Sequence, residues 1–212
     1  SEVLGRDPVL VSDAMKRAAA HGVPEDFLKA TEGYTGAVAR FDTGKPGPTT
    51  AFRSDIDCVL VRETDNPEHL PNKLGFASER PGFMHACGHD GHTAVGLAVA
   101  HWLVMNKDRL CGRFILIFQP AEEGVRGARA MAASGLVDHV DYFLGGHVGG
   151  DAKLGEIAVM DGGFLASTKF DVSIEGTPAH AGNSPELGHS ALMAACAASL
   201  MIQGIPRNSH GE

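Results

Sequence analysis

The sequence predicts an α/β fold in which a mostly parallel sheet lies between helices. The first observation is the continuous apolar run RFILIFQ (113–119), which is typical of a strand buried on both faces. The second is that strand and helix patterns alternate around this run. With 212 residues, 43% of them apolar, the chain is long enough to bury a core.

The elements before this central strand can be taken in order. Residues 9–39 have a polar, helical pattern, with the segment PEDFLKATEG (24–33) started by proline and ended by glycine. TTAFRSDID (49–57) is expected to be a strand that ends in acids, and a long polar loop follows over residues 62–83. TAVGLAVAHWLVM (93–105) is apolar nearly all round, which predicts a helix buried on most sides.

Two elements follow the central strand, and the pattern then changes. AEEGVRGARAMAASG (121–135) predicts a helix closed by Gly135, and VDYFLGGHV (140–148) predicts a further buried strand. In TKFDVSIEG (168–176), apolar and polar residues alternate strictly, as in a strand of an antiparallel sheet with one wet face. An alanine-rich helix is expected over residues 190–203.

We therefore predict two domains, residues 1–165 and 166–212. One strand and one helix are too little to bury a core of their own. The second domain is then either completed by another chain, or the sequence is a fragment.

Charge and cysteine content exclude several classes of function. A net charge of −8 argues against a nucleic-acid partner and against an anionic membrane surface. We see neither an apolar run of the ~20 residues that a membrane span needs nor a secretory signal. The four cysteines show no C-x-x-C spacing, so free thiols in a reducing cytoplasm are expected.

The densest group of chemical side chains is MHACGHDGHT (84–93). Cys87 and His89 are two residues apart and can reach one point from extended backbone, whereas His89 and His92 are spaced to share a helix face. A thiolate with imidazoles suits Zn²⁺ or a similar transition ion. The alternative is an ordinary helix start capped by Asp90, with the histidines in solvent.

Three more motifs are candidates. In FQPAEEG (118–124), Glu122 and Glu123 open a predicted helix, where one could ligate a metal while the other acts as a base; the alternative is simple stabilisation of the helix dipole. His147 ends a predicted strand between glycines. His180, in GTPAHAG (176–182), could equally be an ordinary loop histidine.

What links these motifs is their place at strand ends, where sites gather in α/β sheets. The residues that lie just past predicted strands, or in the loops that follow, are Asp55, Asp57, His89, Glu122, Glu123 and His147.

In this order and spacing, FRSDID, MHACGHDGHT, FQPAEEG, GGHVG and GTPAHAG resemble the di-metal amidohydrolases of the aminoacylase and carboxypeptidase-G family. The resemblance covers the chain from about residue 35 onward. It implies an aminopeptidase-type catalytic domain with an inserted ferredoxin-like lid that forms a homodimer. It also implies two divalent ions, Zn²⁺ or Mn²⁺, and hydrolysis of the amide bond of an N-acyl or N-aroyl amino acid, for which p-aminobenzoyl-glutamate is a candidate.

The resemblance also assigns roles by motif position. Glu122 would be the general base, Asp57 an acid that orients the site, and His180 a contact to the substrate in the partner's site. The implied metal ligands are Cys87, His89, Glu123 and His147.

The sequence departs from the family by stopping within the lid, so a further histidine ligand is expected beyond Glu212. A first helical segment of the family's N-terminal region is also expected to be missing. The alternative function is a non-catalytic binding or oligomerisation module, a truncated or degenerate relative. A structural zinc site is weaker, because no second cysteine pair completes a tetrahedron.

Overall fold

The computed structural model describes residues 5–149, 152–159 and 170–205. Its backbone contacts divide the chain into two units, Ser1–Ile157 and Ala158–Glu212. The boundary predicted between residues 165 and 166 lies outside the described residues.

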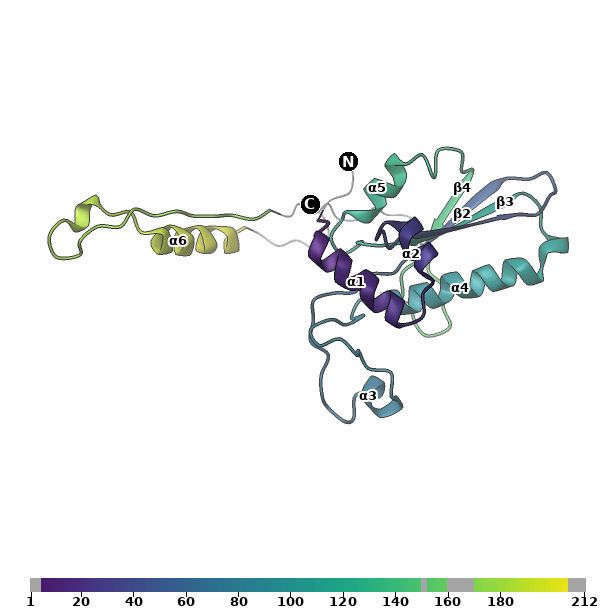
Figure 1. Ribbon diagram of the computed structural model, residues 1–212, viewed down its shortest axis with the longest axis horizontal. Coiled ribbons are helices and arrows are strands. Elements are labelled where there is room, and N and C mark those ends of the chain that lie inside the picture. The colour runs from purple at the N-terminus through teal and green to yellow at the C-terminus, as the bar shows by residue number, and fades with distance from the viewer. Residues whose placement is uncertain (1–4, 150–151, 160–169, 206–212) are drawn as a thin grey trace. The chain divides into compact units, whose positions relative to one another are not determined.

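The first unit is built on a four-stranded sheet with the order β1-β3-β2-β4 (Figure 1). Its strands are β1 (Ala37–Asp42), β2 (Thr49–Asp55), β3 (Arg113–Gln119) and β4 (Tyr142–Gly145). β2 runs parallel to both β3 and β4, and β1 is an antiparallel edge strand on β3. The predicted α/β fold with a mostly parallel sheet is confirmed.

Helices α4 (His89–Met105) and α5 (Gly127–Ala133) cover opposite faces of this sheet (Figure 1). Ala51, Ile115 and Ile117 form the buried core on the α5 face, where Met131 packs against them. On the other face α4 contacts β2 and β3. It approaches closely at Gly96, where a Cβ atom would lie 2.8 Å from both Phe118 Cε1 and Ser54 Oγ.

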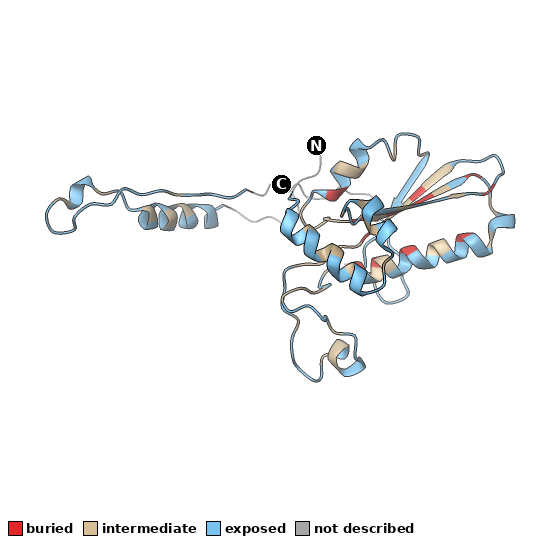
Figure 2. Ribbon diagram, viewed as in Figure 1, coloured by how far each residue is buried: buried red, intermediate tan, exposed pale blue. Residues whose placement is uncertain are grey.

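α4 is buried on one side only, which corrects the prediction of a helix covered on most sides. His92, Gly96 and Leu103 face the sheet, whereas the outer side of the helix is largely exposed (Figure 2). Leu97 and Trp102 are 58% and 53% exposed. The apolar pattern of α4 therefore predicts more burial than the described residues provide for this helix.

The N-terminal helices are α1 (Pro8–Ala20), capped by Asp7, and α2 (Glu25–Thr31). The helical pattern predicted for residues 9–39 is therefore wrong at its end, because residues 37–39 belong to β1. The pairing of Val38 with Ile117 places this segment in the sheet. The hydrogen bonds that residues 37–39 form with β3 outweigh the weak local preference of these residues for a helix.

The long loop before α4 contains the short helix α3 (Leu70–Leu74), and the 3₁₀ turn η1 (Lys107–Arg109) follows α4. Glu63 ties this loop together, accepting hydrogen bonds from the Ser78 backbone N–H at 2.6 Å and from His69 Nε2 at 2.8 Å. No helix among the described residues has the length and apolar character to cross a membrane.

In the second unit, η2 (Pro185–Leu187) precedes α6 (Ala191–Gln203), which confirms the helix predicted over residues 190–203, and Ser190 caps it. The strand predicted over residues 168–176 is not formed in its described part, residues 170–176, although Thr177 and His189 form an isolated bridge. A strand needs a hydrogen-bonding neighbour, and no described segment pairs with this one along its length.

Candidate metal centre

The candidate centre lies where the parallel strands end. Asp55 is the last residue of β2, and Asp57 follows two residues later. Glu122 and Glu123 follow β3, His147 follows β4, and His89 begins α4. Because β2, β3 and β4 run parallel, their carboxyl ends meet at the same edge of the sheet.

His89 is completely buried, and its two ring nitrogens have different surroundings. Nδ1 lies 2.9 Å from the backbone oxygen of Asp57 and 3.2 Å from its Oδ1, so Nδ1 carries the proton and donates it. Nε2 is buried and has no hydrogen-bond partner among the described residues. It faces carboxylate oxygens of Asp55, Glu122 and Glu123 at 3.8, 3.9 and 3.8 Å.

Cys87 and His147 meet beside His89. The Sγ atom of Cys87 lies 3.4 Å from Nε2 of His147, while His147 Nδ1 lies 2.7 Å from the Val148 carbonyl oxygen. That contact places the His147 proton on Nδ1 and leaves Nε2 with its lone pair. The pKa of the Cys87 thiol is raised to about 11, mainly by burial and next by the neighbouring carboxylate of Glu123.

Glu122 and Glu123 lie in a tight turn before α5, not in the first turn of a helix as predicted. Ala121 and Val125 both have a φ of +54°, a left-handed conformation. The Val125 N–H donates to the backbone carbonyl oxygen of Glu122 at 2.7 Å. The helix therefore begins only at Gly127. This turn brings both carboxylates to His89 instead of separating them.

The loop that carries Cys87 ends at Gly88, the N-cap of α4. Gly88 has a φ of +84°, and a Cβ atom there would lie 2.4 Å from Cγ2 of Val148. Asp90 is exposed and makes no side-chain cap, contrary to the alternative in which it caps the helix. Only glycine fits this position, both for its φ and for the space available.

The sequence placed Asp55 among the residues at strand ends but assigned it no role, and its buried pairing with His92 was not predicted. Asp55 is completely buried; its Oδ1 contacts His92 Nδ1, and its Oδ2 lies 2.8 Å from Arg53 Nη1. Burial raises the pKa of Asp55, but the hydrogen bond from His92 and the charge of Arg53 outweigh it and hold this pKa below its usual value. The spacing of three between His89 and His92 was the available signal.

His180 belongs to the second unit. It is exposed, and its Nδ1 accepts the backbone N–H groups of Gly182 and Asn183 at 3.2 and 3.0 Å. Its role in the site therefore stays a prediction.

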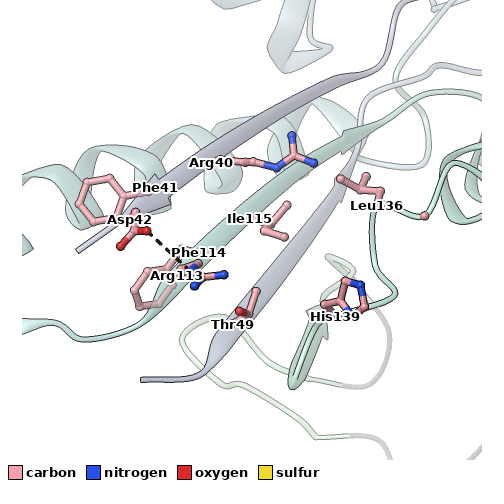
Figure 3. A pocket seen from close by; sticks show the side chains of 10 residues that line it. Arg40, Phe41, Asp42, Thr49, Arg113, Phe114, Ile115, Leu136 and His139 are labelled. Atoms are coloured by element: carbon pink, nitrogen blue, oxygen red, sulfur yellow. Dashed lines mark ion pairs between the residues drawn. The ribbon is translucent and has the colours of Figure 1, made fainter. Parts of the chain in front are cut away.

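A separate hollow lies at the opposite, amino end of β2 and β3 (Figure 3). Its lining includes Thr49, Arg113 and His139, and Arg113 Nε lies 3.6 Å from Asp42 Oδ2. None of the predicted site residues lines it.

The donors at the carboxyl edge fit divalent metal ions. Cys87, His89 and His147 have ligand atoms within 4.8 Å of one another, and so do His89, Glu122 and Glu123. Donor atoms that each lie about 2.0–2.3 Å from one shared ion are separated from one another by comparable distances. His89 belongs to both groups, and its buried Nε2 has no hydrogen-bond partner among the described residues.

The fold and this donor set define an α/β protein with a candidate metal-binding site at the carboxyl ends of its parallel strands. Residues 51–209 match the family model described as peptidase family M20/M25/M40. The chain belongs to this family.

Two relatives illustrate the similarity. The chain is 51% identical to a Haemophilus influenzae homolog of a p-aminobenzoyl-glutamate hydrolase subunit, over 99% of this chain and 49% of that protein. It is 50% identical to an indole-3-acetyl-aspartic acid hydrolase from Enterobacter agglomerans, over 97% of this chain and 47% of that protein. The chain thus spans about half the length of these curated relatives.

Two solved structures share the fold. An aminobenzoyl-glutamate utilization protein from Klebsiella pneumoniae matches with a TM-score of 0.64 and 41% identity, over 99% of this chain and 47% of that one. A dinuclear metal binding peptidase of the M20 family from Bacillus subtilis matches with a TM-score of 0.50 and 34% identity, over 66% and 36%.

Proposed function

We propose that the protein is a metal-dependent amidohydrolase that cleaves the amide bond of an N-acyl or N-aroyl amino acid. The observation that carries this proposal is the buried Nε2 of His89, which lies within 4 Å of three carboxylates and has no hydrogen-bond partner among the described residues. A nitrogen lone pair that is buried and lies close to several carboxylates is suited to bind a cation. The names of the two relatives above refer to hydrolysis of p-aminobenzoyl-glutamate and of indole-3-acetyl-aspartic acid, so p-aminobenzoyl-glutamate is our first candidate substrate.

In this proposal two ions, Zn²⁺ or Mn²⁺, are held by Cys87, His89, Glu123 and His147. Divalent ions supply Lewis-acid chemistry: they polarise a carbonyl group and make water more acidic. A dinuclear site in a structural relative supports the count of two. A further histidine ligand, expected beyond Glu212, is part of the same proposal.

The chain's own carboxylates divide the remaining work. Glu122 is 38% exposed at its side chain and Glu123 is 33% exposed, with Oε1 of Glu123 buried. We assign the more accessible Glu122 to take a proton from water and deliver it to the leaving amine. Asp57 keeps the His89 proton on Nδ1 and accepts the Glu123 backbone N–H at 3.1 Å, which fixes both ligands.

Substituting the two glutamates separately tests this assignment. Glu122→Gln is expected to lower turnover of p-aminobenzoyl-glutamate at least 100-fold while metal content stays at the wild-type level. Glu123→Gln is expected to lower the metal content itself. Glu68→Gln, at an exposed glutamate paired with Lys73, is the matched control. A wild-type protein without bound metal and without turnover of N-acyl amino acids would instead support a non-catalytic module.

We also propose a homodimer formed through the second unit, with His180 contacting the substrate in the partner's site. The exposed apolar residues Leu192, Met193, Leu200 and Met201 of α6 support such an interface. Light scattering of the full protein, with and without Met201→Glu, tests the dimer.

A cytoplasmic location is proposed because the four cysteines are all free.

A further inference from the structure

His92 is a buried histidine with both ring nitrogens in hydrogen bonds. It is 4% exposed, its Nδ1 contacts Oδ1 of Asp55, and its Nε2 lies 2.8 Å from the backbone nitrogen of Val148. A backbone N–H can only donate, so Nε2 is the acceptor and the ring proton is on Nδ1. The ring therefore connects a buried carboxylate on one side with a backbone amide on the other.

The Asp55 side of this connection is held by further polar contacts. Asp55 ends β2 and also pairs with Arg53, whose Nε donates to Gln119 Oε1 at 2.8 Å. Gln119 ends β3 and is 4% exposed. The His92 ring is thus held from behind by the ends of two neighbouring strands.

The Val148 side is the segment that carries His147. β4 ends at Gly145, and Gly146 precedes His147, so the local backbone is permissive. The His92 bond to Val148 fixes the residue directly after His147. The His92 and His147 rings also meet edge to face, with centroids 4.5 Å apart, and His147 Nε2 faces Cys87.

We propose that His92 is a positioning residue, which holds His147 against Cys87 in the geometry that metal binding needs. This inference rests on the proposed function, in which His147 is a ligand. It also sets aside a metal at Asp55, His89 and His92, whose donor atoms lie within 4.8 Å of one another. Ligation by His92 would break its bond to Val148 if the metal took Nε2, and its bond to Asp55 if the metal took Nδ1.

The test uses the full protein encoded by the gene. His92→Phe keeps a flat ring but removes both hydrogen bonds, and His92→Gln can still accept the Val148 N–H. We expect His92→Phe to weaken Zn²⁺ binding about 10–100-fold, the range found for residues that orient metal ligands. It should also alter the thiolate-to-cobalt absorption band of the Co²⁺ form, and His92→Gln should recover most of both. His101→Phe, at an exposed histidine of the same helix, is the control.

A measurement on the unaltered protein covers the case in which His92→Phe does not fold. With ¹⁵N-labelled histidine, NMR should find the His92 proton on Nδ1, both without metal and after Zn²⁺ is added. A proton on Nε2, a direct Zn²⁺ shift of the His92 Nε2 signal, or wild-type Zn²⁺ affinity in a folded His92→Phe protein would overturn the inference. Wild-type Zn²⁺ binding by His147→Ala would instead refute the proposed metal site itself.

Discussion

Asp57 and His89 make a double contact in which His89 Nδ1 lies 2.9 Å from the backbone oxygen of Asp57 and 3.2 Å from its carboxylate. The other carboxylate oxygen of Asp57 accepts the backbone N–H of Glu123 at 3.1 Å. One side chain thus links the loop after β2, the start of α4 and the turn after β3. It also determines which nitrogen of His89 faces the carboxylates.

Asp57→Asn tests this link. The amide has nearly the same shape, but it lacks the charge and has only one acceptor oxygen for the two donors. We expect Zn²⁺ affinity to fall about 10–100-fold in isothermal titration calorimetry. Asp65→Asn, at an exposed aspartate that pairs with Arg62, should bind Zn²⁺ as the wild type does. Equal affinity in both variants would remove Asp57 from the metal site.

The thiol of Cys87 predicts the pH dependence of metal binding. Because its pKa is raised to about 11, the thiol is protonated at pH 7–9, and a metal that binds the thiolate must displace that proton. Metal affinity therefore rises as pH rises, about tenfold per pH unit for this one proton, and the gain ends near the thiol pKa. Proton release on Zn²⁺ addition at pH 8, followed with an indicator dye, should fall by about one proton in Cys87→Ala. Cys196→Ala, in α6, should match the wild type.

Gly96→Ala should destabilise the protein although alanine favours helices. The added methyl group would meet Phe118 and Ser54 at 2.8 Å, so α4 must move away from the sheet. We expect a loss of about 1–3 kcal/mol in the free energy of unfolding, measured by urea denaturation. In Gly91→Ala the nearest atom to the new Cβ is 3.9 Å away, so this control should show no such loss.

The exposed apolar side chains of β4 and α4 predict the behaviour of residues 1–212 produced alone. Tyr142, Phe143 and Leu144 are each more than half exposed, as are Leu97 and Trp102 of α4. Apolar surface of this extent promotes association. We expect the 212-residue chain to bind a hydrophobic dye and to elute as a larger species, and Phe143→Glu to reduce both effects. A monomer that binds no dye would contradict this.

The strand ends were the predictable part of the site. The run RFILIFQ and the acids of FRSDID indicate buried strands and their ends from local pattern alone, and parallel strands bring such ends to one edge. The structure places His89, Glu122, Glu123 and His147 at that edge accordingly.

The finer arrangement was not predictable, because it depends on contacts between distant residues. The left-handed backbone of Ala121 and Val125 has no glycine to signal it. The hydrogen bonds of His92 could not be predicted, since its partners Asp55 and Val148 are 37 and 56 positions away. β1 was missed because its pattern is irregular, and its partner β3 lies far along the chain.

Gly88 carries no chemistry, yet it separates the Cys87 loop from Val148, where a methyl group would come within 2.4 Å of Cγ2. Any larger residue would push away the segment that His92 holds. In a complete substitution scan, position 88 should therefore be as intolerant as the proposed ligand positions. A map of mutational sensitivity would then mark the outline of the proposed metal centre beyond its donor atoms.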